Sequence, residues 1–115
     1  MKMRSDERAG RVVVCHLTGN LEQFTVAEFR QAVSTLAPGL PVIFDLSDVP
    51  FVGSAGLGAL IGAVRRLRES GREVALCSPR PAVNRLFNLV RLPRLVGVLE
   101  NAAAAHQLLV ASSVA

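Results

Sequence analysis

The residues best suited to chemistry lie between Gly53 and Gly58, where the sequence reads Gly-Ser-Ala-Gly-Leu-Gly after a strand-like apolar run and the acidic and turn residues that end it. Ser54 is the only hydroxyl residue in this loop, and it precedes a strongly periodic helical pattern. We therefore expect Ser54 at or near a helix N-cap. A phosphate on this serine would face free N–H groups and the positive end of the helix dipole. The glycines would also let a partner protein lie close to the backbone.

Enzyme and nucleotide motifs fit this loop poorly. A nucleophile elbow requires glycine two residues before the serine, and Val52 occupies that position. The two histidines, His16 and His106, lie in a strand-like run and an alanine-rich terminal helix, where histidine is usually structural or solvent-facing. The glycine spacing reverses the dinucleotide fingerprint, and no Lys-Ser/Thr pair completes a P-loop. Because glycine-rich loops also bind phosphates through their backbone, a nucleotide-sensing module stays an alternative.

Size and composition predict one globular domain over residues 1–115, since half of the residues are hydrophobic. No apolar stretch approaches the roughly 20 residues that span a bilayer, and the charged N-terminus has no apolar segment behind it. We therefore expect a cytoplasmic protein with no membrane insertion. The formal charge is +4, but the arginines are scattered and there is no Trp or Tyr, so direct nucleic-acid binding is not expected. Cys15 and Cys77 lack metal-ligand spacing and are predicted to be reduced core thiols.

Strand patterns alternate with helical patterns along the chain. Residues 2–8 are a candidate hairpin partner of the first long strand, through Ala9 and Gly10. The expected strands are 12–17, 42–46, 73–77 and 95–99, and the expected helices begin near 25, 57, 81 and 102. This order predicts an α/β sandwich with a central mixed β-sheet of four to five strands and about four helices.

Local signals add detail to the expected helices. Thr25 and Glu28 have the spacing of a capping box, in which each side chain accepts from the other residue's N–H. Gly58 and Gly62 lie inside the second helix, where each costs about 1 kcal/mol relative to alanine. That loss is reasonable where the helix packs closely against a sheet or a partner. Pro93 is expected to end the third helix.

Nearly the whole chain, about residues 12–110, resembles a STAS domain of the anti-sigma factor antagonist (anti-anti-sigma) family. The order and spacing of several pieces carry the resemblance. They are Leu17 to Glu22, the helix start at Thr25, Asp45 to Ser47, Phe51 and Val52 with Ser54 to Gly58, Val74 to Cys77, and Pro81 to Phe87.

The resemblance implies a small regulator that is not an enzyme and needs no cofactor. It would bind an anti-sigma factor, usually a serine kinase, and thereby free a sigma factor for transcription. The kinase would phosphorylate the serine that aligns with Ser54, and a PP2C-type phosphatase would reverse the reaction. The residues implied in partner binding are Glu22, Asp48, Gly53, Ser54, Ala55, Gly56, Leu57 and Gly58.

Two positions depart from the family pattern. Gly53 stands where the family commonly has an acidic residue, and Ala55 stands where it commonly has Ser or Thr. The missing carboxylate keeps a second function open, namely an unphosphorylated STAS accessory subunit of a membrane transporter for lipids or anions. Asp45, Asp48 and Glu22 are the candidate like charges near a phosphate on Ser54. The sequence leaves the oligomeric state undecided.

Overall fold

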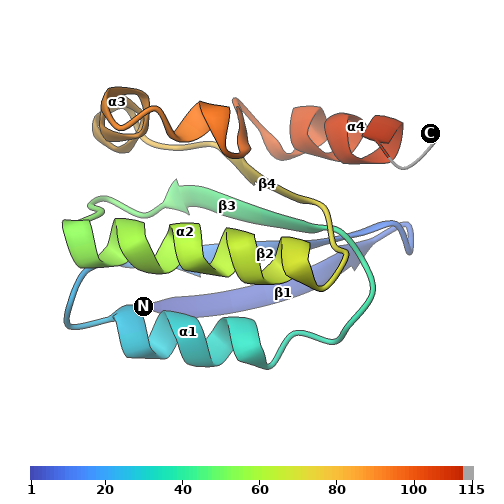
Figure 1. Cartoon of the computed structure of the whole chain (residues 1–115), viewed down its shortest axis with the longest axis horizontal. Coiled ribbons are helices and arrows are strands. Elements are labelled where there is room, and N and C mark those ends of the chain that lie inside the picture. Colours follow the sequence, from blue (N-terminus) through green and yellow to red (C-terminus); the bar gives the residue numbers. More distant parts are fainter. Residues whose placement is uncertain (113–115) are drawn as a thin grey trace.

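A five-stranded mixed sheet organises the chain, as the sequence predicts (Figure 1). The computed structural model describes residues 1–112. Its strands lie in sequence order, with the first antiparallel to the second and the others parallel. They are β1 (Lys2–Arg8), β2 (Val12–Thr18), β3 (Val42–Asp48), β4 (Val74–Cys77) and β5 (Gly97–Leu99).

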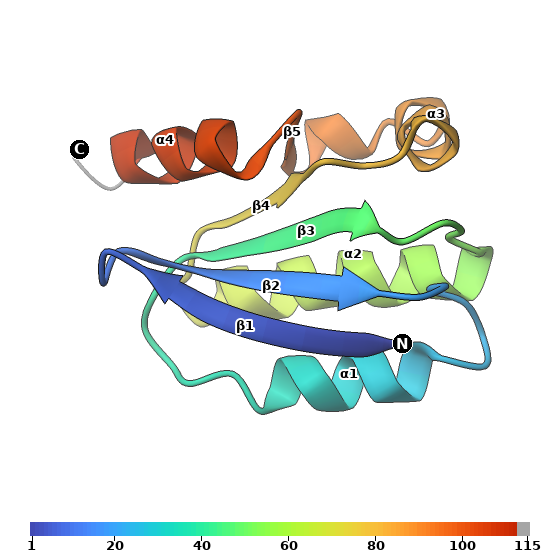
Figure 2. The ribbon, with the colours of Figure 1, turned by 180° about the vertical axis from the view of Figure 1, so that it is seen from behind.

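Helices lie on both faces of this sheet, which confirms the α/β sandwich. They are α1 (Val26–Ser34), α2 (Ser54–Glu69), α3 (Pro81–Leu89) and α4 (Ala102–Ser112), with a short 3₁₀ turn η1 (Leu92–Arg94) after α3. In Figure 2, α1 and α2 lie behind the sheet, and on the face turned to the viewer β1 and most of β2 carry no helix. The helix α4 covers only part of that second face, over β2, β3 and β4.

The core has a large part under α1 and α2 and a small part under α4. Strand β3 contributes to both because successive side chains point to opposite faces. Phe44 belongs to the large part, where its ring lies 5.8 Å from that of Phe29, and Ile43 belongs to the small part. A strand buried on both faces reads as a continuous apolar run, which explains the pattern in the sequence.

The N-terminal hairpin is confirmed, and its turn has left-handed backbone geometry. Ala9 and Gly10 have φ values of 55° and 64°, which match a two-residue type I′ turn. Strand β1 is an edge strand, and its charged side chains disfavour pairing with another chain.

The predicted capping box at the start of α1 is wrong. Thr25 is the N-cap, but its hydroxyl accepts from the Glu22 N–H at 3.0 Å and donates to the Asn20 carbonyl at 2.7 Å. Its side chain therefore stabilises the turn before the helix instead of the first helical turn. Glu28 instead pairs with the N-terminal ammonium of Met1, at 3.5 Å. A local sequence pattern does not show that the preceding loop and the N-terminus offer competing partners.

Two expected boundaries in the C-terminal half also shift. Helix α3 ends at Leu89, four residues before Pro93, because Arg91 has left-handed backbone geometry with φ 59°. Pro93 instead lies inside η1, and β5 is limited to three residues, Gly97–Leu99.

His16 bridges two carboxylates on the sheet face that no helix covers. Its Nδ1 lies 2.7 Å from an Asp45 carboxylate oxygen and its Nε2 lies 2.8 Å from an Asp6 oxygen. Because a neutral imidazole has only one N–H, the doubly protonated ring is the form that donates both bonds to ionised carboxylates. His16 therefore has a structural role here, joining β1, β2 and β3 through their side chains.

Acid is expected to remove the contribution of the His16–Asp45 contact to the stability of the fold. Burial favours the neutral form of Asp45, but hydrogen bonds from the Ser47 N–H and His16 outweigh it and lower the pKa of this carboxyl. Such a carboxylate stabilises the fold at pH values above its pKa in the unfolded chain, which is about 3.9. That stabilisation is lost as the pH falls through the lower pKa of the folded state. The free energy of unfolding, measured by urea denaturation, should therefore fall more steeply below about pH 4 in the wild type than in Asp45→Asn. Equal slopes would contradict this role. Asp48→Asn, at an exposed position, is the control and should keep the wild-type slope.

Candidate functional site

Two loops meet at one edge of the sheet because β2 and β3 are parallel and end side by side. The loop after β2 and the loop after β3 are joined by backbone hydrogen bonds in both directions. The Leu21 N–H donates to the Phe51 carbonyl and the Gly53 N–H donates to the Leu21 carbonyl, each at 2.9 Å. This pairing fixes the residues that lead into α2, and with them the position of Ser54.

Gly56 is the glycine that this arrangement requires. A Cβ atom at this position would lie 1.9 Å from the carbonyl oxygen of Leu21, which is a backbone atom that cannot rotate away. The first turn of α2 therefore lies directly against the loop after β2. Gly56 is buried, so among the residues expected to bind a partner it contributes by placing the helix.

Gly58 and Gly62 do not pack against the sheet, which corrects that part of the sequence interpretation. A Cβ at either position would meet nothing within 4 Å. Both lie on the outer side of α2, where their missing side chains leave the helix backbone open to an approaching molecule.

Ser54 is the first residue of α2, and the N-cap is Gly53, so the expected N-cap position is shifted by one residue. Ser54 and Ala55 are exposed, and Leu57 is half-buried. The first helical bond runs from the Leu57 N–H to the Gly53 carbonyl, at 2.8 Å. Gly53 has no side chain to accept from the N–H groups of the residues between it and Leu57. The serine hydroxyl is therefore accessible beside unsatisfied backbone donors.

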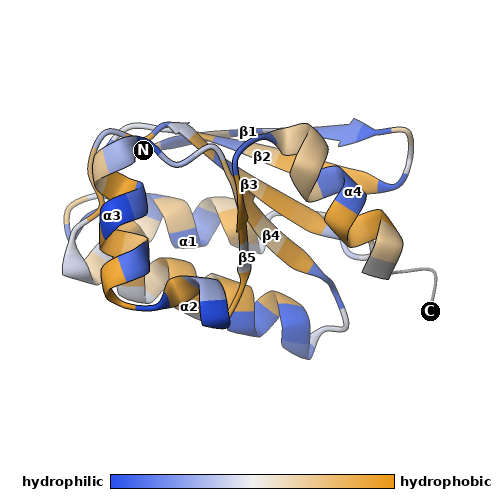
Figure 3. Ribbon diagram, turned by 90° about the horizontal axis from the view of Figure 1, so that it is seen from above, coloured by the Kyte–Doolittle hydropathy of each residue, from blue (hydrophilic) through white to orange (hydrophobic). Residues whose placement is uncertain are grey.

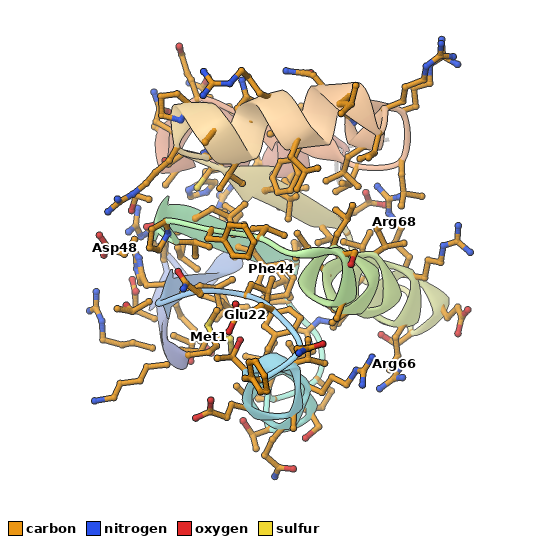
Figure 4. The ribbon with its side chains drawn as sticks, turned by 90° about the vertical axis from the view of Figure 1, so that its left-hand side faces the viewer. Met1, Glu22, Phe44, Asp48, Arg66 and Arg68 are labelled. Carbon is orange, nitrogen blue, oxygen red and sulfur yellow. The ribbon has the colours of Figure 1, made fainter. Side chains whose placement is uncertain are left out.

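The N-terminal end of α2 also lacks the negative charge that often stabilises such an end. Its first turn contains no acidic residue, whereas Arg66 and Arg68 in the last turn match the negative end of the helix. Figure 4 views the molecule from this end, with α1 and α2 seen along their axes. A phosphate on Ser54 would supply the missing charge, so it should be tolerated by the fold.

Of the three carboxylates expected near Ser54, the structure places one beside the loop. The Cβ of Glu22 lies 3.5 Å from where a Gly53 Cβ would be, so Glu22 borders the residue before Ser54. In Figure 4, Asp48 projects at the edge of the view away from α2. Asp45 is held by His16 within the sheet, away from the loop.

A groove of about 290 Å³ runs between α1 and α2. Apolar atoms of Phe29, Val33, Ala59 and Ala63 contribute to its lining, and Gly58, Gly62, Arg30 and Arg66 complete it. Ser54, Gly58 and Gly62 are spaced four residues apart and share one side of α2. The groove therefore lies on the same side of α2 as the serine.

Two aromatic residues near the loop were missed by the sequence interpretation as surface features. Phe51 is 51% exposed and Phe24 is 80% exposed. Phe51 follows Pro50 after the end of β3, and Phe24 precedes the Thr25 cap. A large apolar residue outside the helical and strand periodicities was the available signal, because such a residue has no expected core position.

The cysteines are buried and unpaired among residues 1–112, as predicted. Burial raises the pKa of Cys15 to about 12 and also raises that of Cys77, so both thiols stay protonated and unreactive at neutral pH. No cluster of metal-ligating side chains occurs in the described part of the chain. Within the same residues, no helix has the length and apolar character needed to cross a membrane.

The comparison with known families identifies the fold. A family model described as the STAS domain matches residues 4–105, and the chain therefore belongs to the STAS domain family. The match includes most of β1, which lies outside the region that carries the sequence resemblance.

Individual relatives are regulators by name. The anti-sigma F factor antagonist of Paenibacillus polymyxa is 25% identical over 93 residues, covering 78% of this chain and 80% of that protein. An anti-sigma factor antagonist structure from Mycobacterium paratuberculosis has a TM-score of 0.83 at 24% identity, covering 94% of this chain and 92% of the other. The phosphorylated form of the Bacillus cell fate determinant SpoIIAA has a TM-score of 0.68 at 21% identity, with coverage of 93% and 99%. These structural likenesses support the shared fold.

Replacing the three α2 glycines by alanine should separate their roles. Gly56→Ala should destabilise the protein by about 1–3 kcal/mol or more, because its methyl group overlaps the Leu21 carbonyl. Gly58→Ala and Gly62→Ala should each stabilise it by about 0.5–1 kcal/mol, because alanine favours the helix and meets open space. Chemical denaturation of the three variants measures this, and a similar loss in all three would contradict the assignment of Gly56 as the close contact.

Proposed function

We propose that this chain is an anti-sigma factor antagonist whose binding is controlled by phosphorylation of Ser54. Its partner is a bacterial anti-sigma factor of the serine-kinase type, and binding to it in the cytoplasm releases a sigma factor. The chain itself is a binding protein and not an enzyme. The names of the relatives support the partner class, and the geometry around Ser54 supports the control site.

The accessible Ser54 at an uncompensated helix N-terminus is the observation that carries this proposal. The hydroxyl is exposed, which a kinase requires, and the fold does not need to open to present it. The backbone donors at the start of α2 stabilise a phosphate locally. The modification therefore changes the surface without unfolding the domain.

Partner release follows from what the phosphate does within an interface. Small residues around Ser54 let the partner approach the backbone closely, so a phosphate there occupies space that the partner needs. It also carries about −1.5 to −2 charges that must be desolvated on docking, with Glu22 as a nearby like charge. A penalty of about 3 kcal/mol weakens binding roughly a hundredfold.

The groove between α1 and α2 supports the same docking face. Its open glycines continue from Ser54, and Arg30 and Arg66 bring two positive charges to its lining. The proposed partner-binding residues are therefore Glu22, Gly53, Ser54, Ala55, Leu57 and Gly58, with Gly56 placing the helix, whereas Asp48 projects away from α2 and lies outside this face. A PP2C-type phosphatase would restore the binding form.

Charge at residue 54 should decide partner binding. With the kinase recovered by affinity capture from the native cell and then purified, Ser54→Ala should bind within a few-fold of the wild type. Ser54→Asp and Ser54→Glu should bind about tenfold or more weakly, as measured by calorimetry. The matched control is Ser70→Asp, which adds the same charge just beyond the other end of α2 and should leave the affinity unchanged.

Equal binding by the Ala, Asp and Glu variants would exclude the switch. Phosphosite mapping of the captured chain gives a second readout, since the proposal requires phosphate on Ser54 in cells.

An unphosphorylated chain that co-purifies with a transporter ATPase would support the accessory-subunit alternative. That alternative is favoured by one observation, Gly53 in the place of an acidic residue. Saturable GTP or ATP binding that perturbs residues 53–58 in NMR spectra would support the nucleotide-sensing alternative.

A further inference from the structure

Helix α3 carries more apolar surface than the core uses. Val83 and Phe87 are buried beneath it. Ala82, Leu86 and Leu89 follow one another at intervals of four and three residues, so they form a second apolar stripe on the same helix. Leu89 is 80% exposed, Ala82 is also exposed and Leu86 is half-buried. In Figure 3, α3 lies on the outside of the molecule, away from α4, with hydrophobic segments beside hydrophilic ones.

An apolar hollow of about 250 Å³ adjoins this stripe. It is lined by Pro50, Phe51 and Val52 from the loop before α2, and by Ala82, Val83 and Leu86 from α3. The half-exposed ring of Phe51 belongs to the same surface. A concave recess of this size matches one large apolar side chain of a partner, which is how interface anchors are usually bound.

The segment that carries the stripe has charge of one sign along the sequence. Residues 74–99 contain four arginines and no Asp or Glu. All four arginines, Arg80, Arg85, Arg91 and Arg94, are exposed, and none forms an ion pair with a carboxylate within residues 1–112. Arg85 lies beside the stripe, three residues after Ala82 and four before Leu89, where it would meet a charge on a bound segment.

We propose that the α3 surface, formed by Phe51, Ala82, Arg85, Leu86 and Leu89, binds an acidic amphipathic segment of a protein partner. One apolar side chain of that segment fills the hollow, and its Asp or Glu residues pair with Arg85 of α3 and with the exposed arginines that flank the helix in sequence. Complementary charge identifies the partner as acidic, and the concave hollow favours a protein segment over a flat anionic membrane. This surface is distinct from the groove between α1 and α2.

Selection from a displayed library of random 16-residue peptides tests this proposal. The wild-type chain is the target, and the Leu89→Glu variant serves for counter-selection. Enriched peptides should carry a net negative charge and apolar residues at helical spacing. Their affinity should fall at least tenfold for Leu89→Glu and for Arg85→Glu. Asn84→Glu, which like Leu89→Glu adds one negative charge to α3 but at an exposed position opposite the stripe, should reduce it less than threefold. NMR shifts on peptide binding should concentrate at Phe51, Ala82, Leu86 and Leu89.

Several results would overturn the proposal. These are the absence of enriched peptides, enrichment of neutral or basic peptides, and binding that Leu89→Glu leaves unchanged. Shifts confined to the groove between α1 and α2 would also reject it. Co-sedimentation with phosphatidylglycerol vesicles that depends on Leu89 and Arg85, without peptide binding, would assign the surface to a membrane instead. Leu89 is exposed, so circular dichroism of the variants should show the wild-type fold. The outcome does not depend on Ser54 or on a kinase, so it is separable from that of the proposed function.

Discussion

The contact between Gly56 and the carbonyl of Leu21 is the constraint on which the rest of the site depends. It lets the first turn of α2 lie against the loop after β2, at a separation that no side chain would permit. The hydrogen bonds between Leu21, Phe51 and Gly53 then hold the two loops together. Ser54 is thereby fixed at the start of α2 and exposed, although the two loops that meet beside it are irregular.

This arrangement separates the stability of the fold from the state of the serine. The helix begins at Ser54 with free backbone donors and no acidic residue in its first turn. A phosphate there would be stabilised locally, while the packing beneath it at Gly56 would be untouched. Under the proposed function, phosphorylation would change the surface charge of the domain without changing its shape.

The molecule also has a polar sheet face, on which His16 joins three strands through Asp6 and Asp45. This network lies apart from the Ser54 loop and stabilises the edge strand β1. The two open apolar regions, in the groove along α2 and on the stripe of α3, lie instead on helices that flank the loop. Phe51 lines the second region three residues before Ser54, so the loop borders both surfaces.

The hydrophobic periodicity and the turn residues of the sequence were enough to determine the mixed sheet, the order of the helices and the position of Ser54 near the start of a helix. They do so because burial patterns and glycine turns are local properties of the chain. Tertiary structure alone decided which α2 glycine is required, since Gly56, Gly58 and Gly62 are equivalent in sequence and differ only in what approaches them. It also decided that Thr25 bonds back to Asn20, that His16 meets two carboxylates and that Leu89 stays exposed. The His16 contacts and the exposure of Leu89 depend on segments distant in sequence, whose approach no local pattern specifies, whereas the Thr25 bond depends on the shape of the short loop before it.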